Sequence, residues 1–235
     1  LLQEEVLEAL KRLVELSAKL DMVTVIGAPI AVNSSLYNVA VVIDHGRIVG
    51  IVPKTYLPSG GEFYEARWFA NAHDLTVKEI TLFGETVPIG TDLLFESKED
   101  PSVVLGVEVC EDLWTALPPS SFQAVAGATV LVNLSASNEL VGKAAYRRQL
   151  VEQQSGRCIA GYIYSSAGPG ESTTDVVFSG HCIIAENGSI LRESDRLNMT
   201  STTVVADLDI QSCIHDRMRT TSFAKSFDNS MTTPG

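Results

Sequence analysis

The sequence contains few cysteines and no long apolar run. Four cysteines occur among 235 residues, and no two of them form a CxxC pair. This spacing excludes a zinc knuckle and a disulfide framework, and it is typical of a reducing compartment. No apolar stretch approaches the length of about 20 residues that a membrane helix needs, and no secretory signal pattern is visible. We therefore expect a cytoplasmic protein that does not enter a membrane. The cysteines are Cys110, Cys158, Cys182 and Cys213.

Basic residues are also scarce. The chain has 17 Lys and Arg against 29 Asp and Glu, which gives a formal net charge of −12. Without a basic stripe to neutralise phosphates, neither nucleic acid nor an anionic membrane surface is an expected partner. Four histidines share no metal-ligand spacing, so no metal site is expected.

What the chain does contain is a regular succession of apolar segments. Their lengths, and hairpin signals such as Asp44-His45-Gly46, predict an α/β protein in which two mixed sheets pack face to face with helices outside. Residues 1–220 are expected to form one domain and 221–235 a linker or arm. Helices are predicted over 1–20, 118–126 and 141–156, and strands over 22–30, 36–43, 47–54, 86–89, 93–96, 103–109, 128–134, 158–164, 176–184, 189–192 and 203–208.

One strand ends in a residue that can perform chemistry. The run 103–109 is followed by Cys110, which predicts a thiol at the carboxyl end of a buried strand, where open α/β sheets place reactive groups. There the backbone N–H of Glu111 would lie close to a developing oxyanion. However, most free cysteines are buried small hydrophobes, and the carboxylates of Glu108, Glu111 and Asp112 disfavour a thiolate.

A nucleophilic role for Cys110 would therefore need a cation from elsewhere in the chain. The best candidate is Lys54, which ends the strand-like run 47–54. On these residues alone, an inert buried cysteine is the favoured interpretation of Cys110.

Several motifs together resemble a known family. They resemble the lysine and cysteine motifs of the nitrilase (carbon–nitrogen hydrolase) superfamily, and in particular the glutaminase (amidase) domains of glutamine-dependent NAD synthetases. The resemblance extends from the first helix to about residue 220. The motifs are Lys54-Thr55-Tyr56-Leu57-Pro58, Glu62-Phe63-Tyr64-Glu65, Gly106-Val107-Glu108-Val109-Cys110-Glu111-Asp112-Leu113-Trp114, Asn133-Leu134-Ser135-Ala136-Ser137 and Gly170-Glu171-Ser172-Thr173-Thr174-Asp175.

The resemblance implies a nitrilase-like α-β-β-α sandwich and a Glu-Lys-Cys triad. Cys110 would be the nucleophile that attacks the side-chain amide of glutamine and expels ammonia through a glutamyl thioester. Lys54 would favour the thiolate and, with the backbone N–H of Glu111, stabilise the oxyanion.

Further residues receive roles from the same resemblance. Glu65, or less favourably Glu62, would be the structural glutamate that orients the lysine, although either could instead be a surface carboxylate that pairs with Arg67. Trp114 and Ser137 would line the glutamine pocket, although a tryptophan is more often a core residue and a serine more often a helix cap.

The general-base glutamate of the triad lies in the family before the first helix seen here. We therefore expect it to be missing from this sequence, and the chain alone to be impaired. Glu4, Glu5 and Glu8 fit a solvated helix face better. Gly60 and Gly61 stand where related sequences often carry an aromatic, which affects one pocket wall.

The resemblance also implies partners. Ser59-Gly60-Gly61 is interpreted as a loop, and the Ser-Gly-Gly-rich ATP-loop motif of the synthetase domain does not occur, so the chain is expected to make ammonia without a cofactor. ATP, Mg and deamido-NAD would belong to a synthetase domain of the same polypeptide, which receives the ammonia, and a homo-oligomer is expected. Two alternatives stay open: a stand-alone nitrilase-type amidase or carbamoylase, and a catalytically silent oligomerisation or regulatory domain of the same fold.

Overall fold

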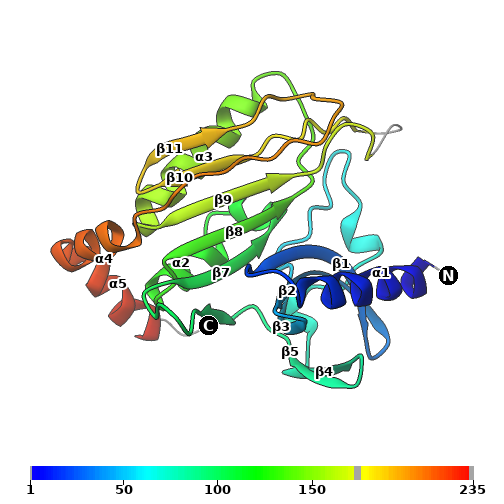
Figure 1. Ribbon diagram of the computed structural model, residues 1–235. Helices are drawn as coiled ribbons and strands as arrows, with labels where there is room; N and C mark the ends of the chain where they lie inside the picture. The colour runs from blue at the N-terminus through cyan, green and yellow to red at the C-terminus, as the bar shows by residue number, and fades with distance from the viewer. Residues whose placement is uncertain (1, 172–175, 233–235) are drawn as a thin grey trace. The chain divides into compact units, whose positions relative to one another are not determined.

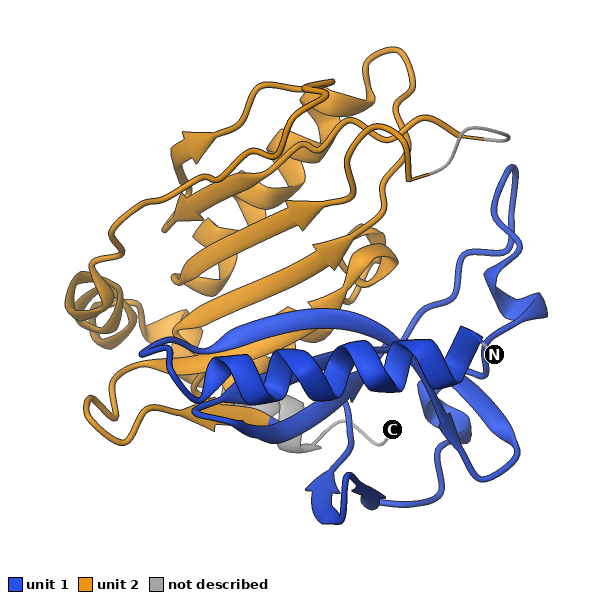
Figure 2. Ribbon diagram, turned by 45° about the vertical axis from the view of Figure 1, so that its right-hand side comes forward, with its two compact units in different colours: residues 1–93 blue, residues 94–235 orange. Residues whose placement is uncertain are grey.

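A computed structural model describes residues 2–171 and 176–232, with side chains as far as residue 226. The chain divides into two units, residues 1–93 and residues 94–235, which Figure 2 shows in different colours. Residues 172–175, which belong to the last of the five motifs, lie outside the described residues.

The first unit is an antiparallel sheet with a helix packed on it. The strands follow the order β1-β2-β3, and α1 lies along them (Figures 1 and 2). Helix α1 is amphipathic, and Val6, Leu10 and Val14 turn one apolar face toward the core of this unit. The elements are α1 (Leu2–Ser17), β1 (Thr24–Val32), β2 (Ser35–Asp44), β3 (Arg47–Pro53), η1 (Glu65–Arg67), η2 (Ala72–Asp74), β4 (Glu79–Leu82) and β5 (Glu85–Pro88).

Tight turns join the strands of this unit. The predicted hairpin between β2 and β3 is confirmed, and both of its turn residues have positive φ, 43° at His45 and 80° at Gly46. This conformation matches the right-handed twist of the flanking strands. Strand β4 was not predicted, because its turn to β5 begins with Phe83, a residue rarely found at φ 52°.

The second unit is built on a mixed sheet. Among its described residues, the strand order is β11-β10-β9-β8-β7-β6, with β7, β8 and β9 parallel and the others antiparallel to their neighbours. Helices α2 and α3 connect the parallel strands and lie behind the sheet in Figure 1. The predicted α/β class with mixed sheets is therefore confirmed. The elements are β6 (Leu94–Glu96), β7 (Val104–Val109), η3 (Cys110–Trp114), α2 (Pro119–Val125), β8 (Val130–Ser135), α3 (Lys143–Cys158), β9 (Gly161–Ser166), β10 (Ile183–Glu186), β11 (Ser189–Glu193), α4 (Ile210–Arg219) and α5 (Thr221–Thr232).

The core of this unit lies between the sheet and its helices. Tyr162 and Tyr164 of β9 are buried there with Leu131 of β8 and Val151 of α3. Because β7 and β8 are parallel and Val109 pairs with Leu134, the segments that follow these strands begin side by side. The fold thus brings Cys110 next to the end of β8.

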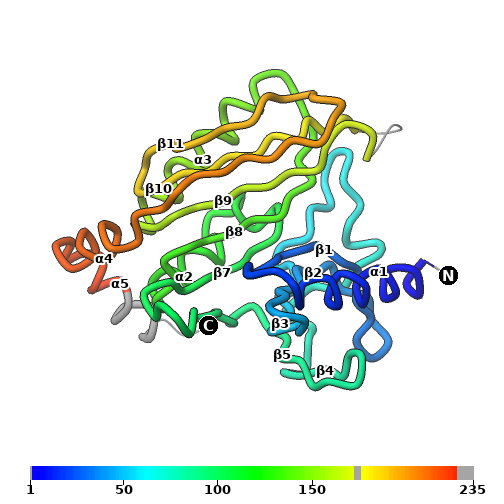
Figure 3. The backbone as a smooth tube through the Cα atoms, in the orientation of Figure 1, coloured from blue at the N-terminus to red at the C-terminus, as the bar shows by residue number. Residues whose placement is uncertain are grey.

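Three predicted segments differ from the structure. Strand β10 begins only at Ile183, because Gly180 (φ 68°) interrupts the preceding run. Residues 203–208 form no strand: the segment runs extended in front of the sheet (Figure 3), and Leu208 packs against Gly161, where an added Cβ would lie 2.5 Å from the leucine. Residues 221–232 form helix α5, and their role as a linker or arm stays a prediction.

None of the helices in the described part of the chain combines the length and apolarity that a membrane span requires.

Candidate active site

The turn between β7 and η3 places a thiol at the end of the sheet. Strand β7 ends at Val109 as predicted, and Cys110 follows with φ 51°, in the left-handed region that residues with a Cβ seldom adopt. The carboxylate of Asp112 accepts a hydrogen bond from the backbone N–H of Val109 at 2.9 Å, which stabilises the turn. The half-buried Cys110 thus sits on the sharp strand-to-helix turn that its sequence context predicts.

The neighbouring strand fixes the backbone of this turn. Asn133 of β8 accepts a hydrogen bond from the N–H of Cys110 at 3.2 Å and donates one to its carbonyl at 3.4 Å. The hydroxyl of Ser135 donates to the same amide oxygen at 3.0 Å. Asn133 is fully buried, so its amide is committed to this contact. In the sequence, Asn133 stands out as a polar residue within an apolar strand. It belongs to one of the five motifs, but we assigned it no role from the sequence.

The acidic residues around Cys110 have structural partners of their own. Glu108 is buried, and it accepts hydrogen bonds from the hydroxyl of Tyr162 and from the backbone N–H of Ser120, the latter at 2.8 Å. Burial raises the pKa of Glu108 above its usual value, against the effect of these donors. Burial, and then the charge of Glu108, raises the pKa of Tyr162 well above its usual value. Glu108 therefore serves to join β7 to α2 and β9.

The predicted substrate residues of this unit lie near the start of α3. Trp114 ends η3, and the ammonium of Lys143 lies 5.0 Å from the centre of its ring. The same ammonium donates to the side-chain oxygen of Asn138, the neighbour of Ser137. Ser137 is buried and accepts a hydrogen bond from Arg147 at 3.2 Å. Sequence reasoning missed Lys143 and Arg147, although their spacing of four residues places them on one helix face.

The first unit holds the lysine. Lys54 directly follows β3 and is 3% exposed, and its ammonium contacts the carboxylate of Glu65 at 2.5 Å. Asn38 donates to the other oxygen of Glu65 at 2.6 Å. Glu65 is therefore engaged with Lys54 and not with Arg67, whose guanidinium lies over the ring of Trp68. Glu62, the second candidate, is half-buried three residues earlier.

The side chains that could bind a metal ion do not gather at one place in the described part of the chain. Between residues 2 and 226, apart from 172–175, no three His, Cys, Asp or Glu side chains cluster in a way that could hold an ion.

Comparisons with known proteins identify the family of this chain. The model of the carbon-nitrogen hydrolase family matches residues 2–218. A glutamine-dependent NAD(+) synthetase from Mycobacterium tuberculosis is 45% identical over 227 residues, which cover 95% of this chain and 33% of that protein. The chain thus spans about a third of the length of the curated relatives it matches.

Solved structures give the same result for the fold. A crystal structure of a glutamine-dependent NAD(+) synthetase from Cytophaga hutchinsonii is similar with a TM-score of 0.73 and 26% identity, over 85% of this chain and 31% of that one. A carbon-nitrogen hydrolase from Helicobacter pylori gives a TM-score of 0.71 at 21% identity, over 98% and 78% of the two chains. The nitrilase-like α/β fold class is confirmed, and the chain belongs to the carbon-nitrogen hydrolase family.

Proposed function

We propose that this hydrolase releases ammonia from the side-chain amide of glutamine, and that the ammonia serves NAD synthesis from deamido-NAD. The observation that carries the proposal is the placement of Cys110 on a left-handed turn at the end of β7, locked by Asn133. The names of the relatives, glutamine-dependent NAD(+) synthetases, supply the substrate.

The chemistry follows from a thiolate at this position. The sulfur of Cys110 attacks the amide carbon, the C–S bond forms, and the carbonyl electrons move onto oxygen. The oxyanion then collapses, the C–N bond breaks, and the nitrogen leaves as ammonia after taking up a proton. Water attacks the resulting glutamyl thioester and releases glutamate and the thiol, so glutamine and water give glutamate and ammonia.

The proposal assigns oxyanion stabilisation to two donors, the ammonium of Lys54 and the backbone N–H of Glu111. Glu65 would hold the lysine in position, since its carboxylate already accepts a hydrogen bond from the ammonium. Glu108 and Asp112 have hydrogen-bond donors of their own, since Tyr162 donates to one and the backbone N–H of Val109 to the other.

The substrate would bind beside Trp114 and Ser137. The oxygen of Ser137 accepts a hydrogen bond from Arg147, which leaves its hydroxyl hydrogen able to donate to an oxygen of the amino-acid head. The half-buried Trp114 would form an apolar wall against the aliphatic part of the substrate.

We further propose that the hydrolysis needs no cofactor, that ATP, Mg and deamido-NAD bind to a synthetase domain of the same polypeptide, and that the protein forms a homo-oligomer in the cytoplasm.

The test is a glutamine hydrolysis assay on the full-length protein, with glutamate release as the readout. Cys110→Ala should lower turnover by at least about 1,000-fold. Cys182→Ala is the matched control, because Cys182 is also half-buried, and it should retain activity. Full activity of Cys110→Ala would refute the proposal.

The same assay separates the main alternative. A stand-alone amidase would hydrolyse a simple aliphatic amide faster than glutamine, whereas the proposal requires the opposite order.

A further inference from the structure

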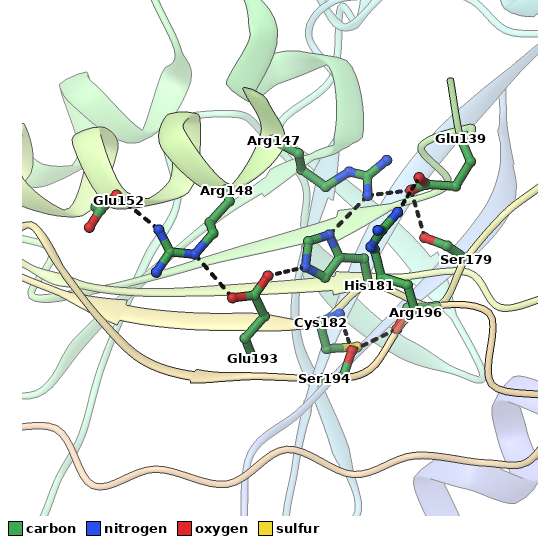
Figure 4. A network of polar contacts seen from close by, with 11 residues as sticks. Glu139, Arg147, Arg148, Glu152, Ser179, His181, Cys182, Glu193, Ser194 and Arg196 are labelled. Carbon is green, nitrogen blue, oxygen red and sulfur yellow. Dashed lines mark hydrogen bonds and ion pairs between the residues drawn. The ribbon is translucent and has the colours of Figure 1, made fainter. Parts of the chain in front are cut away.

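Arg147 is a fully buried cation at the centre of a polar network in the second unit. Figure 4 shows the network, in which the guanidinium of Arg147, from α3, lies between Glu139 and His181. Taking a charge out of water is expensive, so a buried arginine persists only where several groups accept its hydrogen bonds. The positions of these acceptors show which segments of the chain Arg147 holds in place.

Three of the acceptors come from consecutive residues just after β8. One terminal nitrogen of Arg147 donates to the hydroxyl oxygen of Ser137 and to the carbonyl of Asn138, both at 3.2 Å. The other donates to the carboxylate of Glu139 at 2.6 Å. Because the donors of a guanidinium lie in a rigid plane, contacts to three successive residues fix the path of this segment.

Two further segments hold Glu139 in place. The hydroxyl of Ser179 donates to the oxygen that Arg147 also contacts, at 2.7 Å, and Arg196 donates to the second oxygen at 2.9 Å (Figure 4). Burial raises the pKa of Glu139, but the bonds from Ser179 and Arg147 and the two guanidinium charges outweigh it, so the pKa lies below its usual value. Glu139 is thus an anion that anchors the segment.

His181 completes the surroundings of the cation. Its Nδ1 lies 3.0 Å from a terminal nitrogen of Arg147, and a guanidinium can only donate, so Nδ1 accepts and carries no hydrogen. The proton is on Nε2, which donates to Glu193 at 2.7 Å. Burial and the charges of Arg147 and Arg196 lower the pKa of His181, while Glu193 acts in the opposite direction. The ring is a neutral acceptor with a fixed tautomer.

The network is not satisfied throughout. The Nε–H of Arg147 is buried and has no hydrogen-bond partner among the residues described. An arrangement that served stability alone would avoid such a donor, and departures of this kind concentrate at functional sites. The guanidinium of Arg147 thus leaves its Nε–H without an acceptor, and its terminal nitrogens make three hydrogen bonds to residues 137–139.

We propose that Arg147 is a positioning residue that sets the glutamine-binding geometry of Ser137 through its contacts with residues 137–139. This inference rests on the proposed function. It predicts that a loss of these contacts weakens substrate binding while the nucleophile stays intact.

The test is the variant Arg147→Lys in the full-length protein. Lysine keeps the charge but cannot contact Glu139, Asn138 and Ser137 in one plane. The KM for glutamine should rise by about tenfold or more, as the loss of a hydrogen bond to a charged group implies, while kcat changes less. Alkylation of Cys110 by iodoacetamide, which does not need the glutamine pocket, should keep its rate. Arg157→Lys is the matched control, because Arg157 is an exposed residue of the same helix, and it should leave the KM unchanged.

A double variant shows whether the effect passes through Ser137. If it does, adding Arg147→Lys to Ser137→Ala should raise the KM by much less than it does in the unsubstituted protein. An unchanged KM in Arg147→Lys, or full additivity with Ser137→Ala, would overturn the inference and leave the proposed function standing.

Two more outcomes are decisive. If Arg147→Lys does not fold, Glu139→Gln replaces it, because it removes the anion and keeps the shape; an unchanged KM there also overturns the inference. If the unsubstituted protein does not hydrolyse glutamine, the proposed function fails and the inference fails with it.

Discussion

Replacing Cys110 by glycine should give a more stable protein than replacing it by alanine. Both substitutions remove the thiol, but only alanine retains a Cβ at φ 51°. The left-handed conformation costs a residue with a Cβ about 1–2 kcal/mol. Glycine avoids this cost but loses about 0.4–1 kcal/mol through the greater freedom of the unfolded chain. The difference favours glycine by roughly 0.8 kcal/mol, or about 2–3 °C in Tm for a chain of this size.

Cys182 provides the control within the same chain. It is half-buried like Cys110, its φ is not positive, and its backbone N–H donates to Ser194 at 2.9 Å. At such a position glycine is less stable than alanine by about 0.5–1 kcal/mol. The order of the two variants should therefore reverse between the two cysteines.

Urea unfolding of the four variants measures this directly. The free energy of unfolding should be higher for Cys110→Gly than for Cys110→Ala, and lower for Cys182→Gly than for Cys182→Ala. If Cys110→Ala equals or exceeds Cys110→Gly while the Cys182 pair behaves as expected, the turn is not left-handed. The backbone strain ascribed to Cys110 would then be wrong.

Three further predictions concern buried titratable groups. Lys54→Met leaves the carboxylate of Glu65 without its cation and should lower the free energy of unfolding, measured in urea, by about 3–5 kcal/mol. The double variant Lys54→Met with Glu65→Leu should restore most of this loss. Equal losses in the single and double variants would refute the pairing. Tyr162→Phe removes a donor to Glu108 and should cost about 1–3 kcal/mol, less at a pH low enough to protonate that carboxyl, and a loss that does not change with pH would contradict this account. Because the pKa of His181 is lowered from 6.5, the unfolded chain binds more protons than the folded chain below that pH, and stability falls there. The dependence of Tm on pH, measured by thermal unfolding between about pH 5 and 8, should therefore be flatter for His181→Gln than for the unsubstituted protein. Identical dependences would count against a neutral His181.

Features that depend on neighbouring residues were predictable from the sequence. An apolar run followed by charged residues located the end of β3 to within one residue, at Lys54 where the strand ends at Pro53, and the end of β7 at Val109. The pair His45-Gly46 located a hairpin turn, because these residue types tolerate positive φ.

Features that depend on distant residues were not predictable. The amide of Asn133 reaches Cys110 across 23 positions, and Arg147 reaches His181 across 34, so no local pattern indicates either contact. Residues 203–208 have the composition of a strand, but Leu208 packs on the face of the sheet against Gly161, where no hydrogen-bonding edge is available.

The acidic residues near Cys110 show the same limit. In the sequence, Glu108 and Asp112 count only as charges that oppose a thiolate. In the structure, each carboxylate accepts a backbone hydrogen bond, from Ser120 and from Val109. The positions of Glu108 and Asp112 along the chain do not indicate which donors their carboxylates contact.

Mapping a covalent adduct tests most directly whether Cys110 attacks the side-chain amide of glutamine and cleaves its C–N bond. The full-length protein is treated with a diazo-ketone analogue of glutamine, with and without excess glutamine, and its peptides are analysed by mass spectrometry. The account predicts an adduct on Cys110 that glutamine suppresses and that Cys110→Ala abolishes. An adduct on Cys158, Cys182 or Cys213 instead, or labelling of Cys110 that glutamine does not slow, would contradict it.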